Sequence, residues 1–372
     1  MIIKLSNYDK KYRIAAFSIC NETTNLLLSK NLNVMLFDNS RIVFLPENTS
    51  IHLTEIEKDL LKKCCEFDVF EIDIRGNAYK YYNSASIDNA ILITNRCNSN
   101  CIMCPTAEII RKSHTDYDVN TLLKIIKHFP DDAPHITITG GEPFLMKKDI
   151  FNIFNYLKEN LNYTSYLLLT NGRAFCSKEY TMLFKESSPI DLTLGIPLHG
   201  YNADTHDKIT QAPGSFNQTF IGLKNLLSIG ARIELRIVIS KLNAEFITKI
   251  AELITLEFKD IFCVKFIGLE MTGNAAKNFD NVWIDYPIAF LKSQNAINLL
   301  IENGIDVGIY NFPLCAVKKE YWNICEKSIS DYKVRFSNDC DMCIVKDACG
   351  GIFSGTIRMA KEKIKPIRRY DD

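Results

Sequence analysis

Short runs of β-forming residues alternate with helix-like stretches through the middle of the chain, and this alternation constrains the fold more than any other feature. The β-forming runs are residues 90–94, 135–139, 166–170, 191–196, 233–239 and 264–269. Stretches with helical periodicity separate them, for example residues 120–128, 151–161, 216–228 and 244–258. Such alternation predicts a parallel sheet with right-handed crossovers. Periodicity leaves open whether the sheet curls into a full or partial barrel or stays open, but in either case ligands bind at the carboxyl ends of its strands.

The two ends of the chain follow different patterns. Residues 1–86 predict a small β-rich region, with strand-like runs at 13–18, 34–37, 42–45, 69–74 and 78–82 and one helix at 54–65. The last sixty or so residues are rich in cysteine. We therefore expect a β-rich N-terminal region at 1–86, a core at 87–310 and a cysteine-rich C-terminal region at 311–372.

Charge and cysteine content narrow the function classes. The 372 residues include 44 Lys and Arg against 44 Asp and Glu, so no basic excess favours nucleic acid as a partner. No run of eighteen apolar residues predicts a membrane span, and the N-terminus lacks the apolar core of a signal peptide. We therefore expect a cytoplasmic protein. In that reducing compartment, 13 cysteines favour metal binding over disulfides.

Three cysteines, Cys97, Cys101 and Cys104, follow the run at 90–94 with the spacing C-x3-C-x2-C. Three thiolates on one loop can hold three irons of a four-iron cubane, and the fourth iron then keeps an open position for a small molecule. The alternative is a zinc knuckle that His114 completes. Tetrahedral zinc sites usually take their ligands from two separated knuckles, so the spacing favours the cluster.

The next β-forming run ends in Gly140, Gly141, Glu142 and Pro143. Two glycines at a strand end allow the backbone to approach a ligand closely, and Glu142 supplies a carboxylate acceptor. Alone, this string fits any tight turn. One βα unit after the cysteine loop, it predicts part of the same binding site.

The cysteine loop and the Gly-Gly-Glu-Pro strand end together resemble the radical S-adenosylmethionine (SAM) superfamily over roughly residues 88–275. The resemblance implies an α/β fold with a partial (β/α)6 barrel, and a [4Fe–4S] cluster on the three loop cysteines with SAM chelated to its open iron. It also implies that residues 140–143 bind the SAM amino group. Pro197, where many relatives carry a Ser or Asp that reaches the ribose, has neither a hydroxyl nor a carboxylate. Further residues that the resemblance assigns to SAM are Thr170, Asn171, Asn243 and Met271.

A second group of cysteines lies near the C-terminus, at Cys315, Cys325, Cys340, Cys343 and Cys349. The last three have the spacing C-x2-C-x5-C, and one upstream cysteine would complete a four-ligand site for either zinc or a [4Fe–4S] cluster. We expect Cys315 as that ligand because it follows a strand-like run and a proline, with Cys325 as the competitor. The group resembles the SPASM or twitch extensions of radical SAM peptide maturases. Because no cysteine follows Cys349, we expect one auxiliary [4Fe–4S] cluster.

Shorter strings at residues 69–76, 94–101, 312–315 and 328–333 resemble the radical SAM maturases of the His-Xaa-Ser peptide system. That resemblance implies reductive cleavage of SAM to a 5′-deoxyadenosyl radical and hydrogen abstraction from a ribosomally made precursor peptide or small protein. It further implies a one-electron donor of the flavodoxin or ferredoxin type and a partner maturase. It assigns no catalytic residue and no target bond.

Two other interpretations remain open. A radical SAM enzyme can instead act on a small-molecule cofactor precursor, and charged groups inside its barrel, such as Arg236, would then hold a phosphate or carboxylate. Alternatively, two zinc sites can brace a non-catalytic interaction protein, which leaves residues 140–143 as a coincidence. The histidines predict no rival site, and we expect His199, near a strand end, to have a core or surface role.

Overall fold

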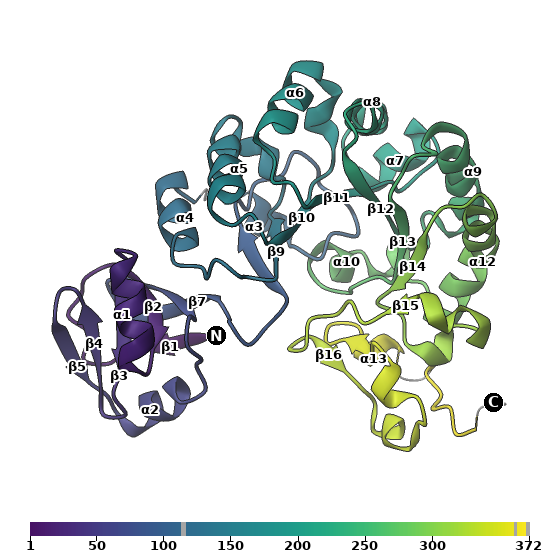
Figure 1. Cartoon of the computed structure of the whole chain (residues 1–372). Helices are drawn as coiled ribbons and strands as arrows, with labels where there is room; N and C mark the ends of the chain where they lie inside the picture. Colours follow the sequence, from purple (N-terminus) through teal and green to yellow (C-terminus); the bar gives the residue numbers. More distant parts are fainter. Residues whose placement is uncertain (113–116, 361–362, 370–372) are drawn as a thin grey trace. The chain divides into compact units, whose positions relative to one another are not determined.

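The computed structural model describes residues 1–112, 117–360 and 363–369, which fall into two compact units (Figure 1). The first unit takes its residues from 1–94, 116–168 and 187–192. The second takes its residues from 95–115, 169–186 and 193–372. Each unit is described below by itself, and the three-part division expected from the sequence stays a prediction.

The first unit contains a seven-stranded sheet built from the N-terminal residues. Its strand order is β1-β7-β6-β2-β3-β4-β5. The strands are β1 (Ile2–Lys4), β2 (Arg13–Ser18), β3 (Val34–Phe37), β4 (Arg41–Leu45), β5 (Thr49–His52), β6 (Val69–Ile72) and β7 (Asn77–Tyr82). All neighbours pair antiparallel except β2 and β3, which are parallel because helix α1 (Asn21–Ser29) crosses between them. Helix α2 (Glu55–Leu61) follows β5 and begins with a capping box formed by Thr54 and Glu57.

Apolar side chains of alternate strand positions form the core of this sheet. They include Ile3, Phe17, Met35, Phe70 and Ile72, all fully buried. The expected β-rich N-terminal region is therefore confirmed. The structure adds β1, β5 and α1, which the sequence did not predict. Helix α1 was missed because its first turn is polar and threonine-rich, and because its N-cap is Cys20, whose sulfur accepts the bond from the Thr23 amide.

The first unit also contains three parallel strands, β8 (Asn89–Leu92), β9 (His135–Thr139) and β10 (Ser165–Leu169). Ile138 of β9 lies opposite Ile91 and Leu168 of its two neighbours, and all three side chains are buried. The crossover helices are α4 (Val119–Ile126) and α5 (Asp149–Asn160). The Asp118 carboxylate accepts a hydrogen bond from the Thr121 amide and so caps α4.

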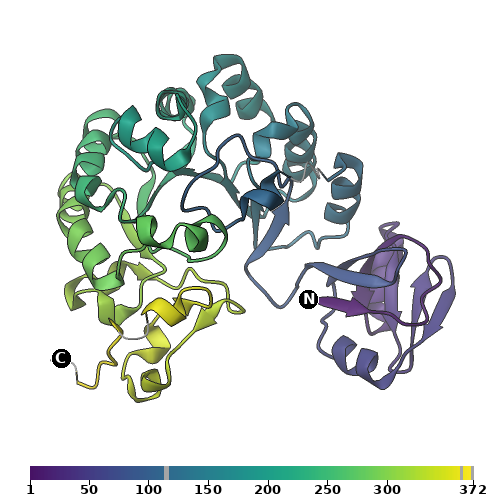
Figure 2. The same ribbon diagram turned by 180° about the vertical axis from the view of Figure 1, so that it is seen from behind.

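The second unit continues the same strand–helix alternation. Its parallel strands are β11 (Leu192–Pro197), β12 (Arg232–Val238), β13 (Cys263–Ile267), β14 (Val307–Tyr310) and β15 (Cys325–Glu326). The longer helices are α6 (Lys178–Ser187), α7 (Ala203–Thr210), α8 (Ser215–Ser228), α9 (Ile247–Glu257) and α12 (Tyr286–Glu302), and the short ones are α3 (Glu108–Arg111), α10 (Gly273–Lys277) and α11 (Phe279–Val282). Helices α8, α9 and α12 lie along one side of strands β12–β14 (Figures 1 and 2). The predicted α/β class with a parallel-strand sheet is therefore confirmed.

The C-terminal residues of the second unit have little regular structure. A two-stranded antiparallel ribbon pairs β16 (Val334–Arg335) with β17 (Ile352–Phe353), and helix α13 (Ile357–Ala360) follows it. Short 3-10 turns lie between these elements, at η4 (Leu314–Ala316), η5 (Lys319–Ile324), η6 (Asn338–Met342) and η7 (Lys346–Ala348). Across the described ranges, none of the helices has the length and apolar character that a membrane crossing requires.

A buried ion pair fixes the end of the N-terminal sheet. The Asp68 carboxylate is fully buried, pairs with the Lys80 ammonium, and accepts hydrogen bonds from the Ser84 and Cys65 amides at 2.9 Å each. The Lys80 side chain is itself only 9% exposed. A buried charge of this kind is tolerable only while its partner and hydrogen bonds remain.

We predict that Asp68→Ala destabilises the first unit by about 3–5 kcal/mol, because the Lys80 charge is then left buried without a partner. Asp59→Ala is the matched control, since Asp59 is 69% exposed and pairs only with Lys62 at the surface; we expect a change below about 1 kcal/mol. Urea unfolding and hydrogen exchange of the β6 and β7 amides measure both variants. Equal protection of these amides in the two variants would contradict the prediction.

Candidate cofactor-binding site

The loop that carries Cys97, Cys101 and Cys104 belongs to the second unit and has almost no regular structure of its own. Two arginines hold its first half. Arg111 donates to the Ser99 carbonyl at 2.9 Å, and Arg173 donates to the Asn98 carbonyl at 2.7 Å. Arg173 also donates through Nη1 to the Ser99 hydroxyl and through Nε to Gln218 at 2.7 Å. The arginines therefore fix the backbone between the first two cysteines.

Asn274, at the start of α10, holds the second half of the loop. Its side-chain amide donates to the Cys101 carbonyl at 3.1 Å, and its backbone amide donates to the Cys104 carbonyl at 2.9 Å. The loop amide of Ile102 donates to the Ile209 carbonyl at the end of α7. Four separate elements thus place the three cysteines, and none of these anchoring residues was predicted from the sequence.

The three cysteines are partly exposed, so metal can reach them. Burial of the Cys101 thiol raises its pKa to about 12, and the neighbouring Cys104 and Cys97 thiolates add to the shift. Without metal, Cys101 is therefore a neutral thiol at pH 7, and iron has to displace its proton. A loop that offers three thiols and no other charged ligand suits an iron–sulfur cluster with one open iron.

The predicted SAM residues Thr170 and Asn171 follow β10 in the second unit. The Asn171 amide donates to the Asn98 side chain at 2.7 Å, which ties it to the cysteine loop. Thr170 is buried, and its hydroxyl accepts a bond from the Gly172 amide. The structure therefore brings Asn171 to the loop directly, while the contact of either residue with SAM stays a prediction.

Met271 and Asn243, also in the second unit, lie in its interior. Met271 is 2% exposed and packs in one cluster with Met103 of the cysteine loop. The Asn243 amide is fully buried and donates to the Val238 and His199 carbonyls at 3.0 and 3.3 Å. Asn243 thus joins the end of β12 to the segment after β11, a positioning role that the sequence did not indicate.

Residues 140–143 belong to the first unit and follow β9. A Cβ atom on Gly140 would lie 2.6 Å from the Thr94 carbonyl oxygen, so only glycine fits there. The Gly141 amide donates to that same oxygen at 2.8 Å. Glu142 is 2% exposed and caps the turn η1 (Pro143–Met146) by accepting from the Phe144 amide at 3.1 Å. The motif therefore has a structural role at Thr94, the residue from which the cysteine loop departs, and its role in SAM binding stays a prediction.

Four C-terminal cysteines, Cys315, Cys340, Cys343 and Cys349, line one small cavity in the second unit. Burial raises the pKa of Cys315 to about 12, and the other three thiols add to that shift. The Cys349 sulfur accepts bonds from the Leu314 and Gly351 amides at 3.4 Å each. Amide donors to sulfur are typical of thiolates that ligate a cluster, so the residues fit the group.

Cys325, the competing ligand, lies at the edge of this group. Its thiol donates to the Tyr321 carbonyl at 3.4 Å, and it does not line the cavity. Burial raises its pKa to about 12, and of the other cysteines only Cys349 contributes to that shift. This geometry favours Cys315 as the fourth ligand, and the ligation itself stays a prediction.

In neither cysteine group are the side chains as close together as the ligands of a single metal ion. Among the described ranges, no three His, Cys, Asp or Glu side chains lie close enough together to hold one metal ion. A cubane cluster spaces its thiolates more widely than one tetrahedral zinc does, so this spacing is compatible with a cluster. His114, the proposed zinc ligand, lies outside the described residues.

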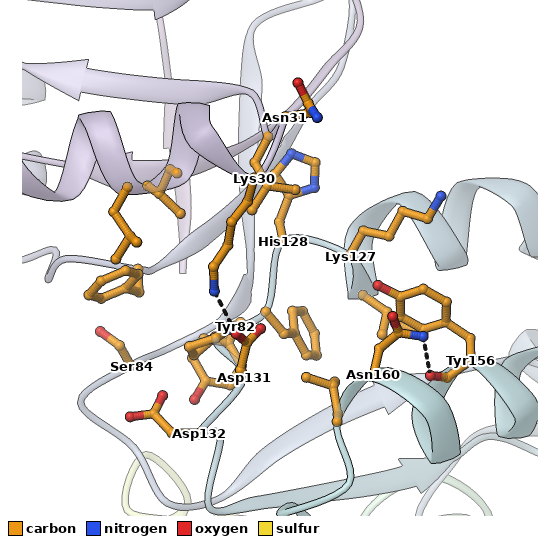
Figure 3. Close-up of a pocket in the computed structure, with 18 of the residues that line it drawn as sticks. Lys30, Asn31, Tyr82, Ser84, Lys127, His128, Asp131, Asp132, Tyr156 and Asn160 are labelled. Carbon is orange, nitrogen blue, oxygen red and sulfur yellow. Dashed lines mark hydrogen bonds and ion pairs between the residues drawn. The ribbon is translucent and has the colours of Figure 1, made fainter.

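A large cavity of about 1170 Å³ lies in the first unit (Figure 3). Lys30, which directly follows α1, contributes an ammonium that meets the Asp131 carboxylate at 2.5 Å, and α5 contributes Tyr156. The other polar residues of the lining include His128, Tyr82, Asp132 and Asn160. None of the residues predicted for cofactor binding lines this cavity, and no motif in the sequence indicated it.

Two stacked histidines lie in the core of the second unit. The rings of His199 and His206 are 5.7 Å apart, and the His206 Nδ1 atom accepts a hydrogen bond from the His199 amide. Burial lowers the pKa of His199 to about 3 and that of His206 to about 4. Both are therefore neutral at pH 7, and the expected core role of His199 agrees with this position.

Comparison with known proteins shows which family and which folds the chain resembles. Residues 91–254 match the model of the radical SAM superfamily. The chain is 29% identical over 166 residues to the AdoMet-dependent heme synthase of Methanosarcina barkeri, which covers 43% of this chain and 45% of that protein. It is 25% identical over 227 residues to a GTP 3′,8-cyclase of Clostridium botulinum, which covers 60% of this chain and 68% of the cyclase.

Among solved structures, the fold is similar to that of Streptococcus suis SuiB bound to its precursor peptide SuiA. The TM-score is 0.50 with 14% identity, over 60% of this chain and 48% of SuiB. The chain thus spans less than half of the length of the heme synthase and of SuiB.

We predict that Arg173→Ala speeds the loss of iron from the cysteine loop about tenfold, because each charge-assisted bond it removes contributes about 1.5 kcal/mol or more. The measurement is the rate at which an iron chelator bleaches the reconstituted protein. Lys185→Ala, which removes an exposed cation from α6, is the control and should match the wild type. Equal rates for the two variants would show that the loop does not depend on Arg173.

We further predict that the free energy of unfolding falls as the pH drops below about 6.5, the ordinary pKa of histidine. The folded-state pKa values of His199 and His206 are lower than this, so the unfolded chain binds more protons, with a slope of up to about 1.4 kcal/mol per pH unit for each histidine. His206→Asn keeps an acceptor for the His199 amide but removes one titrating group. Urea unfolding at pH 7, 6 and 5 should give a shallower slope for this variant than for the wild type. A slope in His206→Asn as steep as that of the wild type would rule out this explanation.

Proposed function

We propose that this chain, which contains a radical SAM domain and so belongs to the enzymes that cleave SAM, modifies a peptide or small protein after translation. The observation that carries the proposal is the C-terminal cavity lined by Cys315, Cys340, Cys343 and Cys349. An auxiliary cluster in such an extension is a feature of the peptide maturases that the sequence resembles. The fold likeness to SuiB, a protein solved with a precursor peptide, supports the same substrate class.

Cys97, Cys101 and Cys104 would hold the SAM-binding [4Fe–4S] cluster. When bound, the cluster and SAM supply a 5′-deoxyadenosyl radical that abstracts a hydrogen atom from the substrate. The protein's own contribution is orientation and exclusion of water. Arg111, Arg173 and Asn274 fix the loop backbone, and the apolar cluster around Met103 and Met271 keeps water from its inner side.

The four C-terminal cysteines would hold a second [4Fe–4S] cluster. The amides of Leu314 and Gly351 are oriented to stabilise the Cys349 thiolate, and the apolar side chains of Leu314 and Val345 shield the group from solvent. Shielding and amide donors together tune the reduction potential of a cluster. This cluster can accept an electron from the substrate, ligate the substrate or brace the C-terminal residues.

The chemistry also implies partners for the enzyme. Reductive cleavage of SAM needs a one-electron donor, for which a flavodoxin or ferredoxin is the chemical class. A partner maturase would complete the peptide pathway. Thirteen cysteines and two oxygen-sensitive clusters fit the reducing cytoplasm, where we propose that the reaction takes place.

A second candidate function is the modification of a small cofactor precursor. It is favoured by the curated relatives, which are a heme synthase and a GTP 3′,8-cyclase. The two candidates share the radical chemistry and differ only in the substrate. They are therefore separated by the origin of the abstracted hydrogen atom.

The first test of the proposal is the metal content of the anaerobically reconstituted full-length protein. We expect about eight irons per chain with matching sulfide, and about four after Cys97, Cys101 and Cys104 are all changed to Ala. Cys315→Ala should lose the auxiliary irons, and the matched variant Cys325→Ala should keep them. About four irons with one zinc would leave the SAM chemistry and make the C-terminal site structural. Zinc alone would overturn the enzyme proposal.

The second test follows the hydrogen atom. The protein is incubated with SAM, a reductant and a deuterated candidate precursor peptide, and 5′-deoxyadenosine is analysed by mass spectrometry. Deuterium in this product is expected for a peptide substrate. Deuterium from labelled GTP or a labelled porphyrin precursor, with none from peptide, would favour the second candidate.

A further inference from the structure

The open face of strands β12, β13 and β14 in the second unit carries a group of charged side chains. Along β12, the fully buried residues Ile233, Leu235 and Ile237 occupy alternate positions and so share one face of the strand. The alternate residues Glu234 and Arg236 therefore point to the other side. Charged residues on an inner strand face are costly unless they are paired or bind a ligand.

The strand register defines where these charges lie. Arg236 lies directly opposite Pro197 of β11 on one side and Lys265 of β13 on the other, and Lys265 lies opposite Gly308 of β14. A Cβ atom at Gly308 would lie within 2.7 Å of the Lys265 Nζ atom, so the glycine leaves room for that ammonium. Across strands β11 to β14 the row of opposite residues is therefore Pro197, Arg236, Lys265 and Gly308. The two cations lie between two residues that have no polar side chain.

The two cations, Lys265 and Arg236, differ in how many of their N–H donors have a partner within the protein. The Lys265 ammonium meets the Glu326 carboxylate at 2.6 Å and lies 5.0 Å from the centre of the Tyr310 ring. Its charge is therefore neutralised within the protein. The cation–π contact adds to that stabilisation.

Arg236 is satisfied only in part. Its Nε atom lies 3.0 Å from the Glu234 carboxylate, yet both of these buried atoms lack a partner with hydrogen-bond geometry. Within the part of the chain that the structure describes, no hydrogen bond reaches its terminal nitrogens, and the side chain keeps about 20% of its surface. The guanidinium also lies 5.9 Å from the Tyr310 ring, on the same face as Lys265. Its two terminal N–H groups therefore form an open fork.

We propose that Arg236 is a specificity-determining residue that binds a carboxylate of the substrate. The planar fork matches the two oxygens of a carboxylate. The charges of the group, two cations and two carboxylates, balance to zero, and only one cation presents unused donors. A single carboxylate fits this arrangement better than a phosphate chain, which would need several free cations.

Arg236 lies two residues before the carboxyl end of β12, where α/β folds bind their ligands. The inference rests on the proposed function, since it names the group by which a peptide would be recognised: an acidic side chain or a C-terminal carboxylate. A free small carboxylate offers the same chemistry, and the experiment separates these sources.

The experiment is isothermal titration of the reconstituted full-length protein with SAM present. The probes are glutarate, inorganic phosphate, an acetylated and amidated pentapeptide with one central glutamate, and the same peptide with glutamine. The proteins are the wild type, Arg236→Gln, Arg236→Lys and Arg232→Gln. The last variant removes an arginine from the other end of the same strand, where its Nε atom donates to Thr193, and serves as the matched control.

We expect the wild type and Arg232→Gln to bind the glutamate peptide about tenfold to a hundredfold more tightly than the glutamine peptide. Arg236→Gln should lose this preference, and Arg236→Lys should recover part of it, because an ammonium supplies charge without the fork. Tighter binding of glutarate than of the peptide would identify a small carboxylate as the ligand. The proposal is overturned if phosphate binds more tightly than every carboxylate, if no probe binds the wild type, or if Arg236→Gln keeps its preference.

SAM cleavage without peptide is measured on the same preparations. Arg232→Gln, whose side chain donates to Thr193 in the native protein, should cleave SAM at the wild-type rate. If no preparation cleaves SAM, the proposed function fails, while the titrations still test the carboxylate site.

Discussion

An irregular loop with three thiols cannot hold its own shape, and the second unit depends on how that loop is held. Its backbone groups are not paired within a helix or a sheet of the loop itself, so other elements have to supply the partners. Arg111 and Arg173 reach the first half, and Asn274 reaches the second half. Arg111 comes from the short helix that follows the loop, whereas Arg173 and Asn274 come from segments far from the cysteines in sequence. Tertiary contacts therefore position the three cysteines. The same hydrogen bonds would limit the movement of a cluster bound to them.

Other residues within each unit also have a supporting role for the backbone. Gly140 is glycine because the Thr94 carbonyl leaves no space for a side chain. The Asn243 side-chain amide donates hydrogen bonds to two backbone carbonyls, those of His199 and Val238. Such residues fix the backbone of the unit to which each belongs, and a sequence motif can include a residue of this kind as well as a ligand. A motif residue can thus be indispensable without touching the cofactor.

Much of the fold could be predicted because its signals are local. Strands β2 and β3 coincide with the predicted runs at 13–18 and 34–37, since each is a short and largely apolar run, which is typical of a buried strand. Helix α1 could not be predicted, since its first turn is polar and a cysteine caps it. The arginine anchors of the cysteine loop were missed for a different reason. Arg173 is distant from the cysteines in sequence, and although Arg111 is near them, no spacing rule connects either arginine to the loop.

The charged residues show how physical context separates structural from functional groups. Asp68 and Lys80 are both buried, and the carboxylate is saturated by backbone amides, so nothing remains to bind a ligand. Arg236 is also largely buried, but its contact with Glu234 leaves the fork of the guanidinium open. Burial of this guanidinium costs free energy, and its contact with Glu234 offsets that cost only in part. A ligand that accepts hydrogen bonds from the terminal N–H groups of Arg236 would supply the missing partners. For a single guanidinium, the matching acceptor is a carboxylate.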